Sequence, residues 1–159
     1  GEMKDVLTSV RVMTEEGEIM ELPAEKLGLG YRTSIIPEKR YIVLGAVISL
    51  TEGKKEEIKA QMDDLRQKRV SKQPLEYPSA GSTFKRPEGY FAGKLIQDSG
   101  LKGFTVGGAQ VSEKHSGFVI NKGNATAADV MELIRQVTAK VKEDTGVTME
   151  PEVKQIGEF

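Results

Sequence analysis

The strongest structural signal in the sequence lies at residues 126–146, which read TAADVMELIRQVTAKVKEDTG. Thr126 and Asp129 form a variant of the capping box that opens a helix, and Gly146 supplies the usual helix stop. Between them, apolar residues recur with helical spacing on one face, at Val130, Leu133, Ile134, Val137 and Val141. We therefore predict a long amphipathic helix in this segment.

Strands and a second helix flank this segment along the chain. Short apolar runs and glycine stops predict a helix at 91–99, short strands at 104–111 and 118–121, and an extended segment at 149–156. On the last of these, Glu150 and Glu152 share a face, because side chains alternate with a period of two along a strand. Helices interleaved with short strands predict an α+β fold.

The N-terminal third is rich in predicted strands. Residues 8–22 predict a hairpin whose turn contains Gly17, and the β-branched run 41–50 predicts a strand with at least one well-buried face. No helix covers this β content, so a domain junction is expected near residues 50–53.

Residues 53–89 divide into a helix and a long loop. A helix is predicted at 53–69, with Ile58, Met62 and Leu65 on one face. Residues 70–89 contain prolines, glycines and serines without periodicity. Long loops of this kind are usually functional or disordered.

Composition excludes several classes of function. The net charge of −1 in 159 residues gives no electrostatic footprint for nucleic acid or an anionic membrane. With no cysteine and His115 as the single histidine, neither disulfides, thiol catalysis nor a metal site is expected. No apolar run approaches the length of a membrane helix and no signal peptide is visible, so a cytoplasmic location is the default.

The loop from Tyr77 to Pro87 is the first candidate site. Gly81 allows the backbone to approach a ligand, Ser82 offers a hydroxyl, and Lys85 and Arg86 offer positive charge. This combination suits a substrate that carries carboxylate or phosphate groups. The alternative is a solvated turn without function. No histidine base pairs with Ser82 in the sequence, so a serine nucleophile is not indicated.

Two other charged residues are candidates, each with an ordinary alternative. Arg32 lies in a glycine-flanked segment and can reach an anion, although a surface arginine after a helix is the simpler interpretation. Glu152 has Glu150 two residues before it, and paired carboxylates can produce an acid, although solvent-facing strand charges are commoner.

The segment Gly28-Leu-Gly30 lacks the third glycine of a dinucleotide fingerprint, and Gly107-Gly108 is not followed by the residues of a phosphate loop.

Five segments, taken in order, carry a resemblance to a known family. They are residues 28–34 (GLGYRTS), 80–87 (AGSTFKRP), 92–103 (AGKLIQDSGLKG), 114–121 (KHSGFVIN) and 149–157 (MEPEVKQIG). Together they resemble the C-terminal half of the UDP-N-acetylenolpyruvoylglucosamine reductases, flavoenzymes of bacterial peptidoglycan and cell-wall synthesis. The resemblance implies that NADPH reduces a bound FAD, which then passes hydride to the enolpyruvyl group of UDP-N-acetylglucosamine enolpyruvate.

The resemblance also implies roles for particular residues. Ser82 matches the family's proton donor, while Arg32 and a protonated Glu152 match the groups that stabilise the enolate. Substrate contacts are implied for six residues, some of them by looser matches: Tyr31, Lys72, Lys85, Arg86, Lys102 and His115. At the position of Arg86 the family often has an asparagine, so this residue departs from the pattern, although an arginine can bind a diphosphate oxygen.

The family's organisation implies two parts in this chain. Residues 1–51 correspond to the end of a FAD-binding domain, and residues 52–159 to an α+β substrate-binding domain with a small mixed or antiparallel sheet. FAD is held in the family mainly by segments that precede residue 1, so we expect this chain alone neither to hold FAD tightly nor to turn over. Two alternatives remain open: a non-catalytic α+β ligand-binding module, or a related flavoprotein with another substrate.

Overall fold

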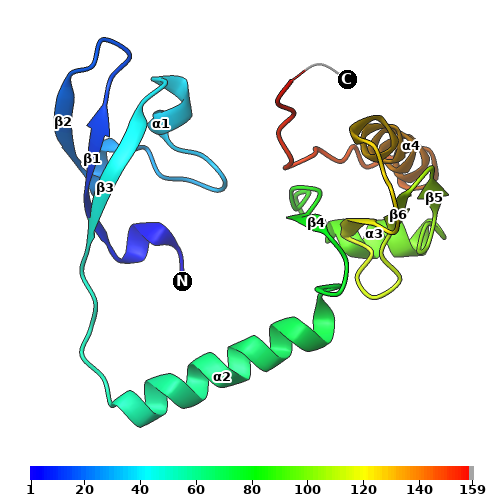
Figure 1. The fold of residues 1–159 in the computed structure, drawn as a ribbon, viewed down its shortest axis with the longest axis horizontal. Helices are drawn as coiled ribbons and strands as arrows, with labels where there is room; N and C mark the ends of the chain where they lie inside the picture. Colours follow the sequence, from blue (N-terminus) through cyan, green and yellow to red (C-terminus); the bar gives the residue numbers. More distant parts are fainter. Residues whose placement is uncertain (158–159) are drawn as a thin grey trace. The chain divides into compact units, whose positions relative to one another are not determined.

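A computed structural model describes residues 1–157, and in it the chain divides into two units, Gly1–Ile58 and a second unit from Lys59 onward (Figure 1). The first unit is built on an antiparallel sheet of order β2-β1-β3, with strands Leu7–Met13 (β1), Ile19–Pro23 (β2) and Ile42–Ile48 (β3). Three short helices accompany them: η1 (Met3–Asp5), η2 (Ala24–Lys26) and α1 (Ile35–Glu38). The predicted hairpin is confirmed, and Gly17 occupies its turn with φ of +85°.

Strand β3 corrects one expectation about burial. The run at residues 41–50 does form a strand, but every residue of β3 is exposed in this chain, including Leu44 and Val47. The buried core of the first unit lies elsewhere, at Val10, Val12 and Leu27. The apolar sequence of β3 indicates that other residues should cover it. The described residues of this unit do not bury its side chains.

The second unit contains an antiparallel sheet of order β4-β7-β6-β5 and two packed helices. Its strands are Ser79–Ser82 (β4), Thr105–Val106 (β5), Ala109–Val111 (β6) and Phe118–Asn121 (β7). Its packed helices are Ala92–Asp98 (α3) and Ala127–Thr145 (α4). The α+β class is thus confirmed, and the helices predicted at 91–99 and 126–146 are present within a residue or so of their expected ends.

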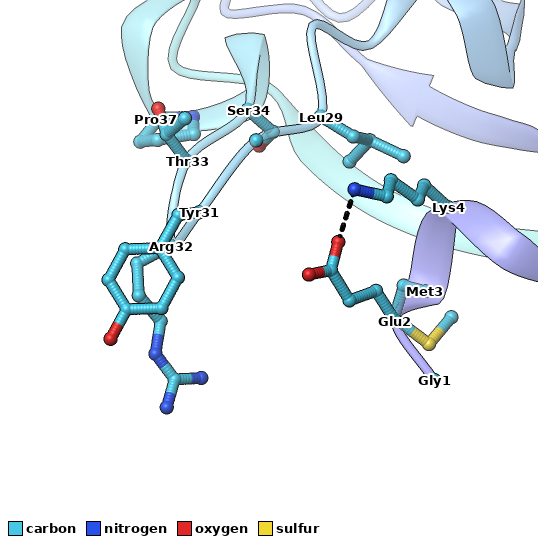
Figure 2. A pocket seen from close by; sticks show the side chains of 11 residues that line it. Gly1, Glu2, Met3, Lys4, Leu29, Tyr31, Arg32, Thr33, Ser34 and Pro37 are labelled. Carbon is cyan, nitrogen blue, oxygen red and sulfur yellow. Dashed lines mark ion pairs between the residues drawn. The ribbon is translucent and has the colours of Figure 1, made fainter. Parts of the chain in front are cut away.

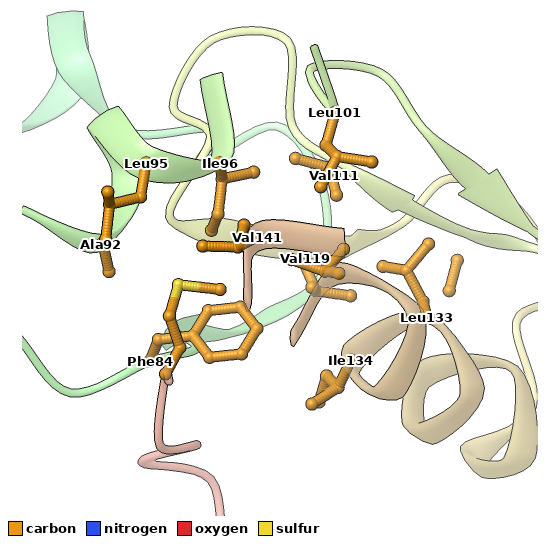
Figure 3. Close-up of a cluster of buried hydrophobic side chains, with 13 residues drawn as sticks. Phe84, Ala92, Leu95, Ile96, Leu101, Val111, Val119, Leu133, Ile134 and Val141 are labelled. Carbon is orange, nitrogen blue, oxygen red and sulfur yellow. The ribbon is translucent and has the colours of Figure 1, made fainter. Parts of the chain in front are cut away.

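A single hydrophobic core joins these elements. Leu133, Val137 and Val141 of α4 are completely buried, and Ile96 of α3 is buried with them. Figure 3 shows Phe84 directed into the same cluster, below the side chains of α3. The apolar stripe that predicts the helix is therefore also the face that packs.

Helix α2 (Lys55–Lys72) forms where a helix is predicted but buries no residue. Its stripe of Ile58, Met62 and Leu65 is exposed. Other positions of the helix form ion pairs, such as Lys59–Asp63 (3.0 Å). None of the helices within residues 1–157 is long and apolar enough to cross a membrane.

Two loop and strand expectations need correction. The loop predicted at 70–89 contains β4, which has no apolar alternation of its own and gains its pairing from β7. The strand predicted at 104–111 is instead a hairpin of β5 and β6, in which Val106 pairs with Ala109. The two-residue turn between them is Gly107-Gly108, where Gly107 has φ of +52°. Turns of this length require positive φ, which glycine adopts without strain.

The predicted capping box at the start of α4 is present and also holds the β5–β6 turn. The Thr126 hydroxyl accepts from the Asp129 N–H (3.1 Å), and the Asp129 carboxylate accepts from the Thr126 N–H (2.9 Å) and the Gly108 N–H (3.4 Å). The hydrogen bonds from Thr126, with the one from Gly108, hold the pKa of Asp129 below its ordinary value of 3.8.

We expect Asp129→Asn to lower the melting temperature at pH 7 and to lose this effect on acidification. A carboxylate whose pKa is depressed by folding adds stability above its unfolded pKa, and that stability is lost as the pH falls below about 3.8. Circular dichroism melts of both proteins between pH 7 and pH 2.5 give the measurement. A melting difference that stays constant over this range would show that the charge is not involved.

Candidate active site

Ser82 lies at a bulge at the end of β4. The pairing of β4 with β7 is irregular between Ser79 and Ser82, where three residues of β4 advance against two of β7. Gly81 lies inside this irregularity with φ of +86°, and a Cβ placed on it would meet no atom within 4 Å. The positive φ alone explains a glycine at this position, and the open space beside it is compatible with the predicted approach of a ligand. Bulges redirect side chains, and this one leaves Ser82 exposed.

The segments that carry Ser82 and Glu152 run side by side, although 70 positions separate them in the sequence. Phe84 and Pro151 form an antiparallel bridge. The Glu152 N–H donates to the Thr83 carbonyl (2.8 Å), and the Lys85 N–H donates to the Glu150 carbonyl (2.9 Å). Buried side chains of Phe84 and Met149 anchor the two segments in the core.

Thr83 connects the two segments by hydrogen bonds, and sequence reasoning did not single it out. Its N–H donates to the Gly117 carbonyl (2.8 Å), and its buried hydroxyl accepts from the Val119 N–H (3.0 Å). Its carbonyl accepts from Glu152, so one residue connects the Ser82 segment both to β7 and to the Glu152 segment. The only sequence signal is a threonine placed between the candidate serine and a core phenylalanine.

Two of the candidate substrate-binding residues have defined partners in this unit. The Lys85 ammonium forms an ion pair with the Glu150 carboxylate. The Arg86 guanidinium lies 4.0 Å from the centroid of the Phe91 ring, and its Nε donates to the Tyr90 carbonyl (3.1 Å). A guanidinium is planar, and its fork of N–H donors matches the geometry of carboxylate and phosphate groups.

His115 lies in a tight turn against the start of α3. Its Nδ1 accepts from the Gly117 N–H (3.1 Å), which leaves Nε2 as the nitrogen directed to other partners, and its ring meets Phe118 edge-on. A Cβ on Gly93 would lie 3.2 Å from the Gly117 nitrogen, and one on Gly117 would lie 3.0 Å from the His115 ring. The two glycines therefore allow α3 to approach the histidine turn closely.

The other two lysines occupy the ends of elements. Lys72 is exposed in the last turn of α2, and Lys114 holds that turn by donating to the Val70 carbonyl (2.9 Å). Lys102 is exposed in the turn between α3 and β5. Both positions present an ammonium group at the surface.

Tyr31 and Arg32 are neighbouring candidates in the first unit. They occupy the tip of a turn closed by Gly30 and Thr33, whose backbones exchange hydrogen bonds of 3.1 and 3.3 Å. Arg32 has φ of +55°, a conformation that is uncommon for a residue with a side chain and that concentrates at functional positions. Figure 2 shows the tyrosine ring and the guanidinium projecting together from this turn, beside a pocket of about 620 Å³.

The structure thus groups the candidates within each unit. Ser82 and Glu152 lie on neighbouring segments, with Lys85 on the same pair of segments. Arg86 lies against Phe91, just before α3, and His115 lies beside Gly93 within α3. Such an arrangement provides a hydroxyl, a carboxyl group and several cations, which suits proton delivery to an anionic substrate.

Comparison with known proteins decides the family. The family model described as "UDP-N-acetylenolpyruvoylglucosamine reductase, C-terminal domain" matches residues 73–156. The chain belongs to this family. The match covers most of the second unit, including Ser82, Glu152, Arg86 and His115.

Individual members of the reductase family are similar over the whole chain. The UDP-N-acetylenolpyruvoylglucosamine reductase of Agathobacter rectalis is 63% identical over 159 residues, which are 100% of this chain and 51% of the relative. That of Lachnoclostridium phytofermentans is 61% identical, over 99% of this chain and 51% of the relative. The crystal structure of the reductase from Thermus caldophilus matches with a TM-score of 0.82 and 39% identity, over 97% of this chain and 54% of that one. The chain spans about half the length of the curated relatives it matches.

Proposed function

We propose that this chain is the substrate-binding part of a cytoplasmic UDP-N-acetylenolpyruvoylglucosamine reductase. The substrate would be UDP-N-acetylglucosamine enolpyruvate, and the product would be UDP-N-acetylmuramate for peptidoglycan synthesis. The observation that carries the proposal is the backbone pairing of the Ser82 and Glu152 segments in a chain of this family. In the complete protein, FAD reduced by NADPH would supply hydride to the enolpyruvyl double bond.

The chemistry of this chain's own residues would be proton delivery and charge stabilisation. After hydride reaches one carbon of the double bond, negative charge develops on the carbon next to the substrate carboxylate. The Ser82 hydroxyl would give its proton to that carbon. Arg32 and a protonated Glu152 would stabilise the enolate, because preorganised donors act most strongly where charge develops.

The remaining candidates would bind the substrate's anionic groups. Arg86, held on Phe91, has the planar donor geometry that recognises a diphosphate, and His115 offers Nε2 from the neighbouring turn. Lys72, Lys85 and Lys102 would add positive charge at this surface, and Tyr31 would accompany Arg32. Lys85 is already paired with Glu150, so its role would include positioning that segment.

The two long helices of this chain offer no favourable place at their N-termini for the FAD diphosphate. The N-termini of long helices are the usual places for a dinucleotide phosphate, yet α4 begins with Asp129 accepting two backbone N–H groups, and α2 carries Glu56 and Glu57 in its first turn. Carboxylates at these ends oppose a second anion. We therefore assign FAD binding mainly to the part of the longer relatives that this chain does not match.

The same proposal assigns residues 1–51 to the end of a FAD-binding domain and residues 52–159 to the substrate-binding domain. Two exposed apolar surfaces support it. Both faces of β3 are exposed, and so is the stripe of Ile58, Met62 and Leu65 on α2. An 18-residue helix without packing is marginal in water, so a further part of the protein is expected to cover these surfaces.

We expect the chain alone to bind no FAD tightly. The purified chain, incubated with excess FAD and then desalted, should show no flavin absorbance. A joined protein, made of this chain and the part of the Agathobacter rectalis reductase that it does not match, should retain flavin. Flavin that stays with the isolated chain would contradict the assignment of FAD binding to the other half.

Calorimetry of the joined protein with UDP-N-acetylglucosamine enolpyruvate separates the alternatives. The reductase proposal predicts saturable binding and turnover with NADPH. Binding without turnover would indicate a ligand-binding module that has lost its chemistry. Flavin reduction by NADPH without any response to this substrate would indicate a flavoprotein with another substrate.

A further inference from the structure

A cavity of about 550 Å³ lies in the second unit and is lined in part by the segments that carry Ser82 and Glu152. Its walls come from β4, β7, the N-terminal half of α4 and residues 153–156. Val119, Ile120, Val130, Met131 and Ile134 make most of its surface apolar, and Lys154 lies at the C-terminal wall. No role in the proposed reaction has been assigned to this cavity.

We propose that this cavity binds a small amphipathic carboxylate, with its apolar body against β7 and α4 and its carboxylate beside Lys154. The volume is in the range of small-molecule sites, which are largely apolar with a few polar groups that fix orientation. Lys154 is the one lysine or arginine among the described lining residues, and it gives the preference for an anion.

The acidic groups of the adjacent helix do not oppose this charge preference. Asp129 is engaged by the backbone N–H groups of Thr126 and Gly108. Glu132 accepts from Arg135 at 2.6 and 2.7 Å and from Gln136 at 2.7 Å. The hydrogen bonds from Arg135 lower the pKa of Glu132 to about 2, so it stays paired over the physiological range. Among the described residues that line the cavity, Lys154 is the charged one.

The position of the cavity couples it to the candidate active site. Thr83 and Val153 line it, and they directly follow Ser82 and Glu152 in the chain. A ligand in the cavity would contact the backbone that holds both residues. Such a ligand would therefore inhibit the proposed reaction. This inhibition rests on the proposed function, whereas binding to the cavity does not.

The test is an amide NMR titration of the whole chain with 1-naphthaleneacetate and with the uncharged 1-naphthaleneacetamide. We expect saturable shifts at Thr83, Ile120, Met131 and Val153, with a dissociation constant of about 1 mM or tighter for the carboxylate. The amide should bind at least about threefold more weakly, because it lacks the charge that meets Lys154.

Two variants and one control make the result decisive. Ala127→Trp, at an exposed position of the lining, should block the cavity and abolish the shifts. Lys154→Ala should remove the preference for the carboxylate, and Lys142→Ala, on α4 outside the lining, should preserve it. Absence of saturable shifts at 10 mM probe, or shifts confined to β3 and the α2 stripe, would overturn the site. A carboxylate preference that survives Lys154→Ala would overturn the ligand class.

Discussion

Replacing Ser82 with alanine, in a protein that joins this chain to the unmatched part of the Agathobacter rectalis reductase, should leave NADPH-driven flavin reduction unchanged. Re-oxidation of the flavin by substrate should slow about 100-fold or more, since a positioned general acid contributes about 10²–10⁴ in rate. The two half-reactions can be followed separately by stopped-flow flavin absorbance. The split arises because Ser82 acts on the substrate carbon and not on the nicotinamide.

A matched serine controls for loss of a hydroxyl in general. Ser71 is exposed on α2 and donates to the Lys68 carbonyl at 3.1 Å, so Ser71→Ala should leave both half-reactions unchanged. Substrate re-oxidation at an undiminished rate in Ser82→Ala would remove the proton-donor role. Equal slowing of both half-reactions would point to a structural defect instead.

The sequence predicts elements well where the element's own residues supply the stabilising contacts. Helix α4 has its cap, its apolar stripe and its stop within one segment, and all three are present. Strand β4 is different, because its glycine and serines carry no strand preference and its stability comes from β7 and from the buried Phe84. Pairing between distant segments is not visible in local pattern.

The candidate site shows the same division. Residue types suggested Ser82 and Glu152 separately, whereas the Phe84–Pro151 bridge and its backbone hydrogen bonds bring their segments together. Thr83 was missed because its role lies in three hydrogen bonds, two through its backbone and one through its hydroxyl, that no motif records. Burial of β3 was predicted wrongly because the sequence of a strand does not reveal whether the same chain provides its cover.

Gly108→Ala is expected to lower the free energy of unfolding by about 2–3 kcal/mol, at the upper end of the usual cost of overpacking. A Cβ on Gly108 would lie 2.2 Å from the Gly123 carbonyl oxygen and 2.4 Å from the Ala125 nitrogen. Both atoms are backbone, so no side chain can rotate away. The sequence showed only that Gly107-Gly108 is not a phosphate loop. In the structure, the two glycines allow the β5–β6 turn to pack against the segment that leads into α4.

Urea unfolding of Gly108→Ala and Gly123→Ala tests this explanation with two substitutions of the same chemistry. A Cβ on Gly123 would meet no atom within 4 Å, so Gly123→Ala should be neutral or stabilise the chain by up to about 1 kcal/mol through the unfolded state. The Gly108→Ala protein should also lose part of the hydrogen bond from the Gly108 N–H to Asp129, because the turn must move away from α4. Its melting temperature should then depend less on pH below 3.8 than that of the parent chain. Equal stability of the two variants would mean that the turn relaxes freely and that close packing does not explain the glycine.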